Sequence, residues 1–346
     1  MPGLLDHSVG WGAVESTYGT PVTVTKHAEW TPGNALDYVK DVKQGAGLRT
    51  GAKVSRSTRR VVTHARGDGS LKFDFLSKGL GLPLQAAFGT GVSTLVAGST
   101  FQQLFTPTQT NTLLPSLTIQ EGIVQAGGTV DAYTWAGCSV KSFQVDCPNG
   151  DIITVQFDID ARSLATGTAY VSPVLPSGGT LFHFGSGVVT FGGTLTVPTT
   201  TALGSVAGGT GYNVRSWSLK VDNALDLDRL VVGAVGSNRN QPTVGNRSIQ
   251  FTAEIEYDSV SGTILRDAHI NETPIPILVQ ATTAEVLSTG VATLQFAMPA
   301  TVINSGPIPQ PSDDKTIVTQ VEFEVLDNSV AAQALYGVVR TADAAL

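Results

Sequence analysis

The chain has 346 residues, of which 41% are hydrophobic and 14% charged, enough apolar material for a sizeable core. Its formal net charge of −7 argues against a protein that grips nucleic acid, because such binding rests on cationic side chains that displace phosphate counterions. No segment approaches the roughly 20 apolar residues of a membrane span, and the N-terminus lacks the pattern of a signal peptide. We therefore expect a protein made in the cytosol that binds no membrane.

The first part of the chain carries turn signals and little regular alternation. Residues 1–58 are predicted to form an N-terminal arm with long loops, whereas residues 59–346 are predicted to form a β-rich domain. Apolar residues alternate on both sides of Gly67-Asp68-Gly69, which predicts a β-hairpin turning at these residues. A helical spacing of leucines before Gly89 predicts a short helix with Pro83 in its first turn.

The middle of the chain holds the most regular strand pattern. Val140–Val145 and Ile153–Ile159 flank a Pro-Asn-Gly-Asp turn and predict a half-buried hairpin. Its even-numbered residues Thr154, Gln156, Asp158 and Asp160 are predicted to face solvent. Residues 163–213 are rich in Gly, Thr, Ser and Pro and predict a loop-rich section with one or two strands. Residues 214–223 predict a further strand. Its opening Val-Arg-Ser-Trp resembles Val-Lys-Ser-Phe at residues 140–143, an echo too short to establish a repeat.

Two later segments alternate strictly between apolar and polar residues. They are Arg247–Asp258 and Val318–Leu326, and both predict strands. Ser329 is predicted to cap a short helix over Val330–Tyr336 that Gly337 ends. Many strands with only one or two short helices predict a mainly β fold, a sandwich or barrel with flanking helices.

The two cysteines, Cys138 and Cys147, fall in one extended segment. Nine residues of strand would separate them by about 30 Å, and their opposite parity predicts opposite faces. We therefore expect no disulfide and read both as small hydrophobic residues in a reducing compartment.

No phosphate loop, nucleophile elbow or zinc-protease motif occurs, so we expect no enzyme. Three carboxylate pairs share a strand face each, as a glycosidase would require. Each pair also belongs to a regular polar stripe, which favours a solvated sheet face. Asp226/Asp228 and Asp313/Asp314 lack calcium-loop spacing, so we assign no metal and no cofactor. The three pairs are Asp158 and Asp160, Glu254 and Glu256, and Glu322 and Glu324.

One basic cluster interrupts the acidic chain. Its neighbours are Ser, Thr and Val, without the aromatic residues that stack nucleic-acid bases. The cluster is either a solvated loop or a contact for an acidic surface of a neighbouring subunit, and the sequence leaves both open. It comprises Lys53, Arg56, Arg59, Arg60 and Arg66.

The order of these pieces resembles the tail tube (major tail) proteins of bacteriophages with long, non-contractile tails. The resemblance covers nearly the whole chain and is weakest over residues 163–213. It rests on the following runs: Gly10-Trp11-Gly12-Ala13-Val14-Glu15, Tyr18-Gly19-Thr20-Pro21, Gly47-Leu48-Arg49, residues 66–73, residues 79–89, residues 137–143, residues 216–225 and residues 247–257.

The resemblance implies a structural virion protein that forms stacked, hexameric rings around a channel for DNA ejection. Such a protein is assembled in the host cytoplasm into the virion tail. Its implied partners are further copies of itself, a tape measure protein, and terminator and tip proteins, while DNA passes without specific binding. Under this reading the three carboxylate pairs are candidates for the channel lining, and Lys53, Arg56, Arg59 and Arg60 for contacts between rings.

Two alternatives stay open from the sequence. Another virion β-protein, such as a capsid decoration or receptor-binding module, would also be acidic and rich in Gly and Thr. A carbohydrate-active enzyme on a β-sandwich is the second, although four Trp residues form no evident aromatic platform.

Overall fold

A computed structural model describes residues 3–51, 53–109, 113–232, 239–308 and 316–346. Its helices are α1 (Gly81–Phe88) and α2 (Ser259–Ile270), with 3-10 turns η1 (Ser57–Arg59) and η2 (Phe184–Ser186). The strands are β1 (Gly3–Gly12), β2 (Val24–Ala28), β3 (Leu36–Gln44), β4 (Arg60–Asp74), β5 (Gly89–Ala97), β6 (Thr100–Pro107), β7 (Leu117–Gln125), β8 (Val130–Cys147), β9 (Thr154–Ala161), β10 (Ser163–Ala165), β11 (Gly187–Phe191), β12 (Thr194–Thr196), β13 (Ser205–Ala207), β14 (Thr210–Gly211), β15 (Val214–Asp222), β16 (Ser248–Glu256), β17 (Ile275–Val286), β18 (Val291–Ser305), β19 (Val318–Val325) and β20 (Tyr336–Thr341).

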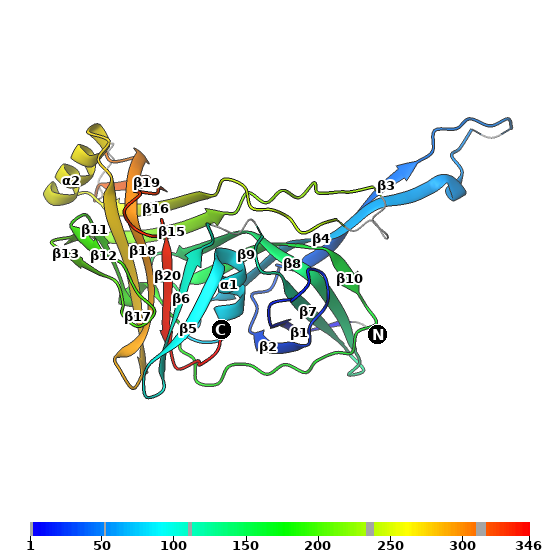
Figure 1. Cartoon of the computed structure of the whole chain (residues 1–346), viewed down its shortest axis with the longest axis horizontal. Helices are drawn as coiled ribbons and strands as arrows, with labels where there is room; N and C mark the ends of the chain where they lie inside the picture. The colour runs from blue at the N-terminus through cyan, green and yellow to red at the C-terminus, as the bar shows by residue number, and fades with distance from the viewer. Residues whose placement is uncertain (1–2, 52, 110–112, 233–238, 309–315) are drawn as a thin grey trace.

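The main sheet is an antiparallel run in the order β3-β4-β9-β8-β15-β16-β19-β18. Strand β8 is long enough to serve two sheets. Its C-terminal half lies in the main run, whereas its N-terminal half pairs with β7 and β10 beside β1 and β2. In Figure 1 the β3–β4 hairpin projects from one end of the molecule and α2 lies at the other.

The core lies on one face of the main sheet. Alternation places every second residue there, and Phe143, Phe157, Phe251 and Phe323 are all buried. Helix α1 covers this face, with the Phe88 and Phe143 rings 4.9 Å apart. The predicted mainly β, sandwich-type fold with two short helices is confirmed.

Helix α1 forms where the sequence predicts it. Pro83 lies in its first turn, where a missing N–H costs no hydrogen bond. Gly89 ends the helix with φ of 101°, a left-handed conformation that glycine adopts without strain.

The predicted hairpin at Gly67-Asp68-Gly69 is wrong, because β4 runs straight through these residues. The glycines do not form a turn. They are needed because neighbouring atoms lie too close to leave room for a Cβ. A Cβ on Gly67 would lie 2.6 Å from the Trp135 ring, and one on Gly69 would lie 2.1 Å from the Ala35 carbonyl oxygen.

The predicted helix over Val330–Tyr336 is also wrong. Ser329 has a left-handed backbone with φ of 56°, and Tyr336 begins strand β20 between β18 and β6. Pairing with two strands and burial of Leu335 and Val338 outweigh the local capping signal. The second helix is instead α2, which the sequence pattern did not indicate.

Residues 1–58 are more regular than an arm with long loops. They contain β1, β2 and β3, and the side chains of Val9 and Trp11 in β1 are fully buried. The proposed boundary between residues 58 and 59 falls inside the β3–β4 hairpin.

The predicted β8–β9 hairpin, the strands β15, β16 and β19, and the short strands within residues 163–213 are all confirmed. Both cysteines are free, as expected. The prediction that they face opposite sides is wrong, because a bulge between Val140 and Ser142 shifts the alternation and buries both.

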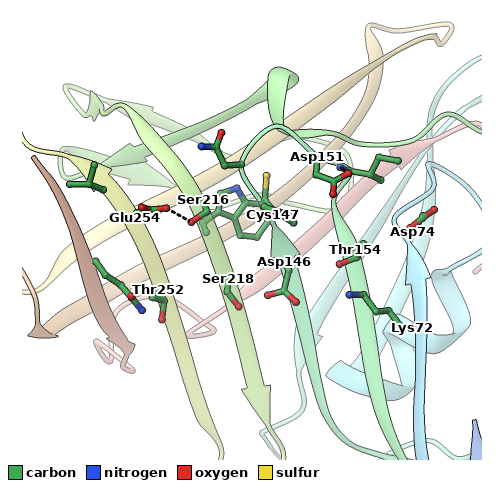
Figure 2. A pocket seen from close by; sticks show the side chains of 16 residues that line it. Lys72, Asp74, Asp146, Cys147, Asp151, Thr154, Ser216, Ser218, Thr252 and Glu254 are labelled. Atoms are coloured by element: carbon green, nitrogen blue, oxygen red, sulfur yellow. Dashed lines mark hydrogen bonds between the residues drawn. The ribbon is translucent and has the colours of Figure 1, made fainter. Parts of the chain in front are cut away.

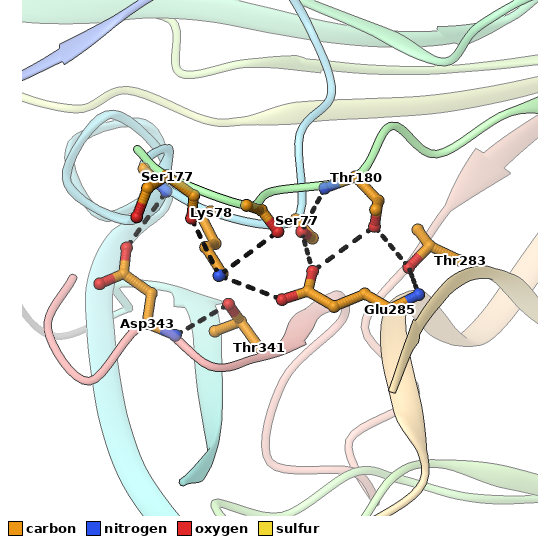
Figure 3. Close-up of polar contacts among 10 residues, drawn as sticks. Ser77, Lys78, Ser177, Thr180, Thr283, Glu285, Thr341 and Asp343 are labelled. Carbon is orange, nitrogen blue, oxygen red and sulfur yellow. Dashed lines mark hydrogen bonds and ion pairs between the residues drawn. The ribbon is translucent and has the colours of Figure 1, made fainter. Parts of the chain in front are cut away.

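A polar network joins two loops to the end of β17 at the side of the fold (Figure 3). The Lys78 ammonium lies 3.2 Å from the Glu285 carboxylate, and the Ser77 hydroxyl donates to the same carboxylate. The Thr180 and Thr283 hydroxyls are 2.7 Å apart. These contacts fix residues 76–80 and 177–180 against the end of β17.

We expect Gly69→Ala to lower the free energy of unfolding by about 1–3 kcal/mol, because backbone atoms of Ala35 and Leu36 must shift. Urea unfolding measures this. Gly167→Ala is the control, since a Cβ there meets nothing within 4 Å. Equal stability of both variants would contradict the straight path of β4.

Candidate functional site: a concave polar sheet face and a basic arm

A polar face covers six neighbouring strands of the main sheet, from β4 through β9, β8, β15 and β16 to β19. The core takes the opposite face, so alternation turns the remaining side chains outward. The strand register aligns them in rows across the sheet. One row is Lys72, Gln156, Gln144, Lys220, Gln250 and Glu324. The next is Asp74, Thr154, Asp146, Ser218, Thr252 and Glu322.

This face is hollowed. A depression of about 840 Å³ is lined by residues of all six strands, from Lys72 on β4 to Gln320 on β19. Figure 2 shows Asp146, Ser218 and Thr252 side by side on their strands, with Glu254 bonded to Ser216. The hollow is open and wide, lined by acids, amides and hydroxyls.

Five of the six carboxylates predicted from the sequence lie on this face. Asp158 accepts a hydrogen bond of 2.6 Å from Ser142, and Glu254 one of 3.1 Å from Ser216. Glu256 forms an ion pair with Arg215 at 2.8 Å. Glu322 and Glu324 are exposed, and accept hydrogen bonds from Ser305 and Asn304.

The prediction that Asp160 faces solvent is wrong, because its side chain is fully buried. Its carboxylate lies 3.6 Å from Arg66 and forms a second ion pair with Arg239, which is 2% exposed. Arg239 comes from the long connection between β15 and β16, which covers this end of the face. Asp160 therefore anchors that connection and has no access to solvent in the single chain.

Sequence reasoning missed three acids that share the face: Asp74, Asp146 and Asp222. The same alternation that selected Asp158 contains the signal, but none of the three has a second acid two residues away on its strand. Near the base of the projecting hairpin, Asp68 and Asp160 are paired with cations within the chain. Over the rest of the polar face, among the described residues, eight carboxylates stand against the three cations Lys72, Arg215 and Lys220.

The hollow offers little for nucleophilic catalysis. Cys147 is the one thiol among its lining residues, and burial raises the pKa of that thiol to about 11. The thiol therefore stays protonated near neutral pH, whereas the nucleophilic form of cysteine is the thiolate. No histidine lines the described hollow to act as its base.

The basic cluster lies on the projecting hairpin (Figure 1). Lys53, Arg56, Arg59 and Arg60 are all exposed, and η1 places the last residues of the cluster at the start of β4. We call residues 38–66 the arm. No carboxylate occurs between Val42 and Gly67, so the outer arm is a purely cationic projection.

Arg66 belongs to the base of the arm and not to its tip. It is half-buried and lies 3.5 Å from Asp68 as well as near Asp160. Arg66 is therefore neutralised within the chain, unlike the other members of the basic cluster.

The loop carboxylates that were considered for calcium do not form a site in the described chain. Asp226 and Asp228 are exposed, and Asp226 accepts a hydrogen bond from the Asp228 backbone. Asp313 and Asp314 lie outside the described residues. Among the residues that are described, no three His, Cys, Asp or Glu side chains gather closely enough to hold a metal ion. No described helix combines the length and apolarity that crossing a membrane requires.

We expect Arg239→Met to lower the free energy of unfolding by about 3–5 kcal/mol, because it leaves the buried Asp160 carboxylate with Arg66 alone. Adding Asp160→Asn should restore part of this loss, since it removes the uncompensated charge. Denaturant unfolding measures both. Arg266→Met, which breaks the exposed pair with Asp267, should change stability by less than about 1 kcal/mol. An equally small effect at Arg239 would contradict the anchoring role.

Comparison with known proteins bears on what this surface is for. A search of curated proteins finds no match to the chain. A protein-family model described as "Phage tail tube protein" matches residues 6–325, which is nearly the whole chain. The β-rich fold agrees with this match. This chain belongs to the phage tail tube protein family.

Proposed function

We propose that copies of this chain form the stacked rings of a phage tail tube, with the concave polar face lining the channel through which DNA passes. The observation that carries this is the hollowed six-strand face with its excess of carboxylates. A channel with this lining repels DNA phosphates, so a genome can slide through without adhering. The amides and hydroxyls between the acids keep the lining wetted and free of apolar patches.

The sheet edges support assembly into a closed wall. Strand β3 pairs only with β4 among the described residues, so its outer edge is unpaired. An exposed edge invites pairing with another chain, and closing strands into a ring removes the edge. A wall built from neighbouring copies would therefore give this edge a strand partner that it lacks in the single chain.

The arm is suited to a contact between rings. It projects beyond the body of the molecule and carries Lys53, Arg56, Arg59 and Arg60 without carboxylate neighbours. The rest of the chain is acidic, so an arm from one ring would meet an oppositely charged surface on the next. This favours the contact reading of the basic cluster over a merely solvated loop.

The remaining parts of the proposal rest on the resemblance. On this resemblance we propose six tube units per ring, assembly in the host cytoplasm, a tape measure protein inside the tube, and terminator and tip proteins at its ends. A non-contractile tail type is likewise part of the proposal.

Electron microscopy of the purified, concentrated protein tests the function directly. Hollow tubes or stacked rings are the expected result, with and without tail partners. Compact monomers or trimers under every condition would instead favour a decoration or receptor-binding module. A reconstruction with the polar face on the outer wall would overturn the channel assignment.

Reversing the charge of the arm should block stacking without unfolding the chain. We expect Arg59→Glu with Arg60→Glu to give a folded protein, because both side chains are exposed, that forms no tubes. The control is Arg59→Lys with Arg60→Lys, which keeps the charge and should polymerise. Circular dichroism checks the fold and electron microscopy the tubes. Normal tubes from the Glu variant would refute this role.

Reversing the charge of the channel should make tubes retain DNA. We expect Glu254→Lys, Glu322→Lys and Glu324→Lys together to leave assembly intact but bind short DNA duplexes, in a salt-sensitive manner. Co-sedimentation of labelled duplex with tubes at low and high salt measures this. The matched Gln variants should bind far less. Lysine tubes that bind no more DNA than wild type would place these residues away from the channel.

A further inference from the structure

The first part of the main sheet is built as a unit with a definite strand order. Strand β3 is joined to its antiparallel partner β4 by a long excursion, and helix α1 follows. The long strand β8 pairs through its first half with β7, which precedes it, and through its second half with β9, which follows. Strand β9 returns to pair with β4, and β10 returns to the first half of β8.

The second part of the sheet repeats this plan element by element. Strand β15 is joined to its antiparallel partner β16 by a long excursion, and helix α2 follows. The long strand β18 pairs through its first half with β17 and through its second half with β19. Strand β19 returns to pair with β16, and β20 returns to the first half of β18. Strands β5 and β6 are an addition within the first unit, and β11 to β14 lie between the units.

The sequence repeats at matching places in the two units. Val155-Gln156-Phe157-Asp158-Ile159 on β9 corresponds to Val321-Glu322-Phe323-Glu324-Val325 on β19. The register agrees with this match. Phe157 lies opposite Leu71 and Phe143, whereas Phe323 lies opposite Phe251 and Ile303. Both phenylalanines are buried in the core, and the acid that follows each one lies on the polar face.

Inside the chain, the two units are joined by direct pairing of β8 with β15. The register places Phe143 opposite Val221 and Ser142 opposite Asp222. The edge strand of unit one therefore pairs with the edge strand of unit two without a gap, and the polar face is continuous across the junction.

The main sheet ends at β18 on one side and at β3 on the other. The second half of β18 corresponds to β8 at the internal junction, and the start of β3 corresponds to β15, but neither has a strand partner on its outer side among the described residues. Beyond Thr301, strand β18 has β19 on one side and no strand on the other among the described residues. At that edge a ring nitrogen of His269 lies 2.8 Å from the Ile303 carbonyl oxygen, so α2 partly guards the edge in the single chain. The start of β3 has no strand on its outer side in the part of the chain that the structure describes. There the Leu36 N–H donates to the Glu121 carboxylate at 3.1 Å, so Glu121 guards this edge as His269 guards the other, and both contacts would give way to strand pairing.

We propose that this chain holds two tube units side by side, and that the ring closes when β18 of one copy pairs with the start of β3 of the next, in the register of β8 and β15. The partner is a second copy of this chain. The inference rests on the proposed function, and for a wall of six units it means that three chains form each ring.

The matching register fixes which residues meet. Leu71 and Phe251 are equivalent, so the residues two places earlier, Gly69 and Ile249, are equivalent too. Their partners are Leu36 and Val221. Inside the chain, Phe143 lies opposite Val221 and Ser142 lies opposite Asp222. Ile303 is equivalent to Phe143, and Leu36 to Val221, so the junction between copies places Ile303 of one copy opposite Leu36 of the next. The neighbouring pair is Val302 opposite Asp37.

The excursion between β15 and β16 shows how such a connection lies on a neighbouring unit. Arg239 of this excursion belongs to unit two but pairs with Asp160 on β9 of unit one. By the same correspondence, the base of the next copy's arm would lie beside the end of β19 of the first copy. Asp327 is exposed there and Lys40 and Lys43 are exposed near the base of the arm, whereas the tip with Lys53, Arg56, Arg59 and Arg60 would extend beyond this contact toward the adjoining ring.

Two measurements on the full chain test the proposal. The first is the rotational symmetry of wild-type tubes by electron microscopy, where three chains per ring are expected. The second is oxidation of a variant with Asp37→Cys and Val302→Cys. Opposed strand residues are close enough for a disulfide, so a ladder of cross-linked chains ending at the trimer is expected on a non-reducing gel.

Matched pairs of cysteines serve as controls. Ser142→Cys with Asp222→Cys marks the internal junction and should form a disulfide within one chain, even in the monomer. Lys40→Cys with Val302→Cys shifts the register by three residues and should cross-link poorly.

Each outcome decides a separate point. Tubes with six chains per ring, or a ladder that ends at the hexamer, would overturn the two-unit proposal while leaving the tube function intact. Tubes of the Asp37→Cys, Val302→Cys variant whose introduced thiols stay reduced would overturn the junction. Absence of tubes would refute the proposed function, and a lack of cross-links in whatever oligomer forms would then overturn the junction as well.

Discussion

The structure depends on one long strand, β8, that must serve two sheets. It changes sheets near Gly137, whose φ of 68° no side chain would readily allow. The buried carboxylate of Glu15 fixes this bend by accepting hydrogen bonds from the Gly137 amide and from the Ser116 and Thr118 hydroxyls. The same carboxylate accepts from the Gly19 amide. The N-terminal segment thus holds the crossing point of the sheets.

Parts of the fold could be predicted because they depend on local pattern. Strict alternation in β9, β16 and β19 identified strands, their buried faces and five of the eight acids counted on the polar face. Pro83 and Gly89 identified α1, since both act through backbone conformation. The Gly-Trp-Gly opening was informative only through its resemblance to a family, because nothing local shows that Glu15 will be buried.

The rest could not be predicted, because distant contacts decide it. Gly67 and Gly69 resemble turn residues, but what they avoid is Trp135 and the backbone at Ala35. The segment after Ser329 resembles a helix in sequence, but its last residues form β20 because they pair with β18 and β6. Asp160 has the same parity as Asp158, and only a cation far along the chain, Arg239, removes it from the surface.

Alternation also separates two kinds of evolutionary change. A residue of β9 or β19 belongs either to the core or to the polar face, so a substitution on one side leaves the packing of the other in place. A lineage can therefore alter the charge and chemistry of its hollowed face, residue by residue, at little cost in stability. The phenylalanines behind that face have no such freedom, since each fills a place in the core that a smaller side chain would leave empty.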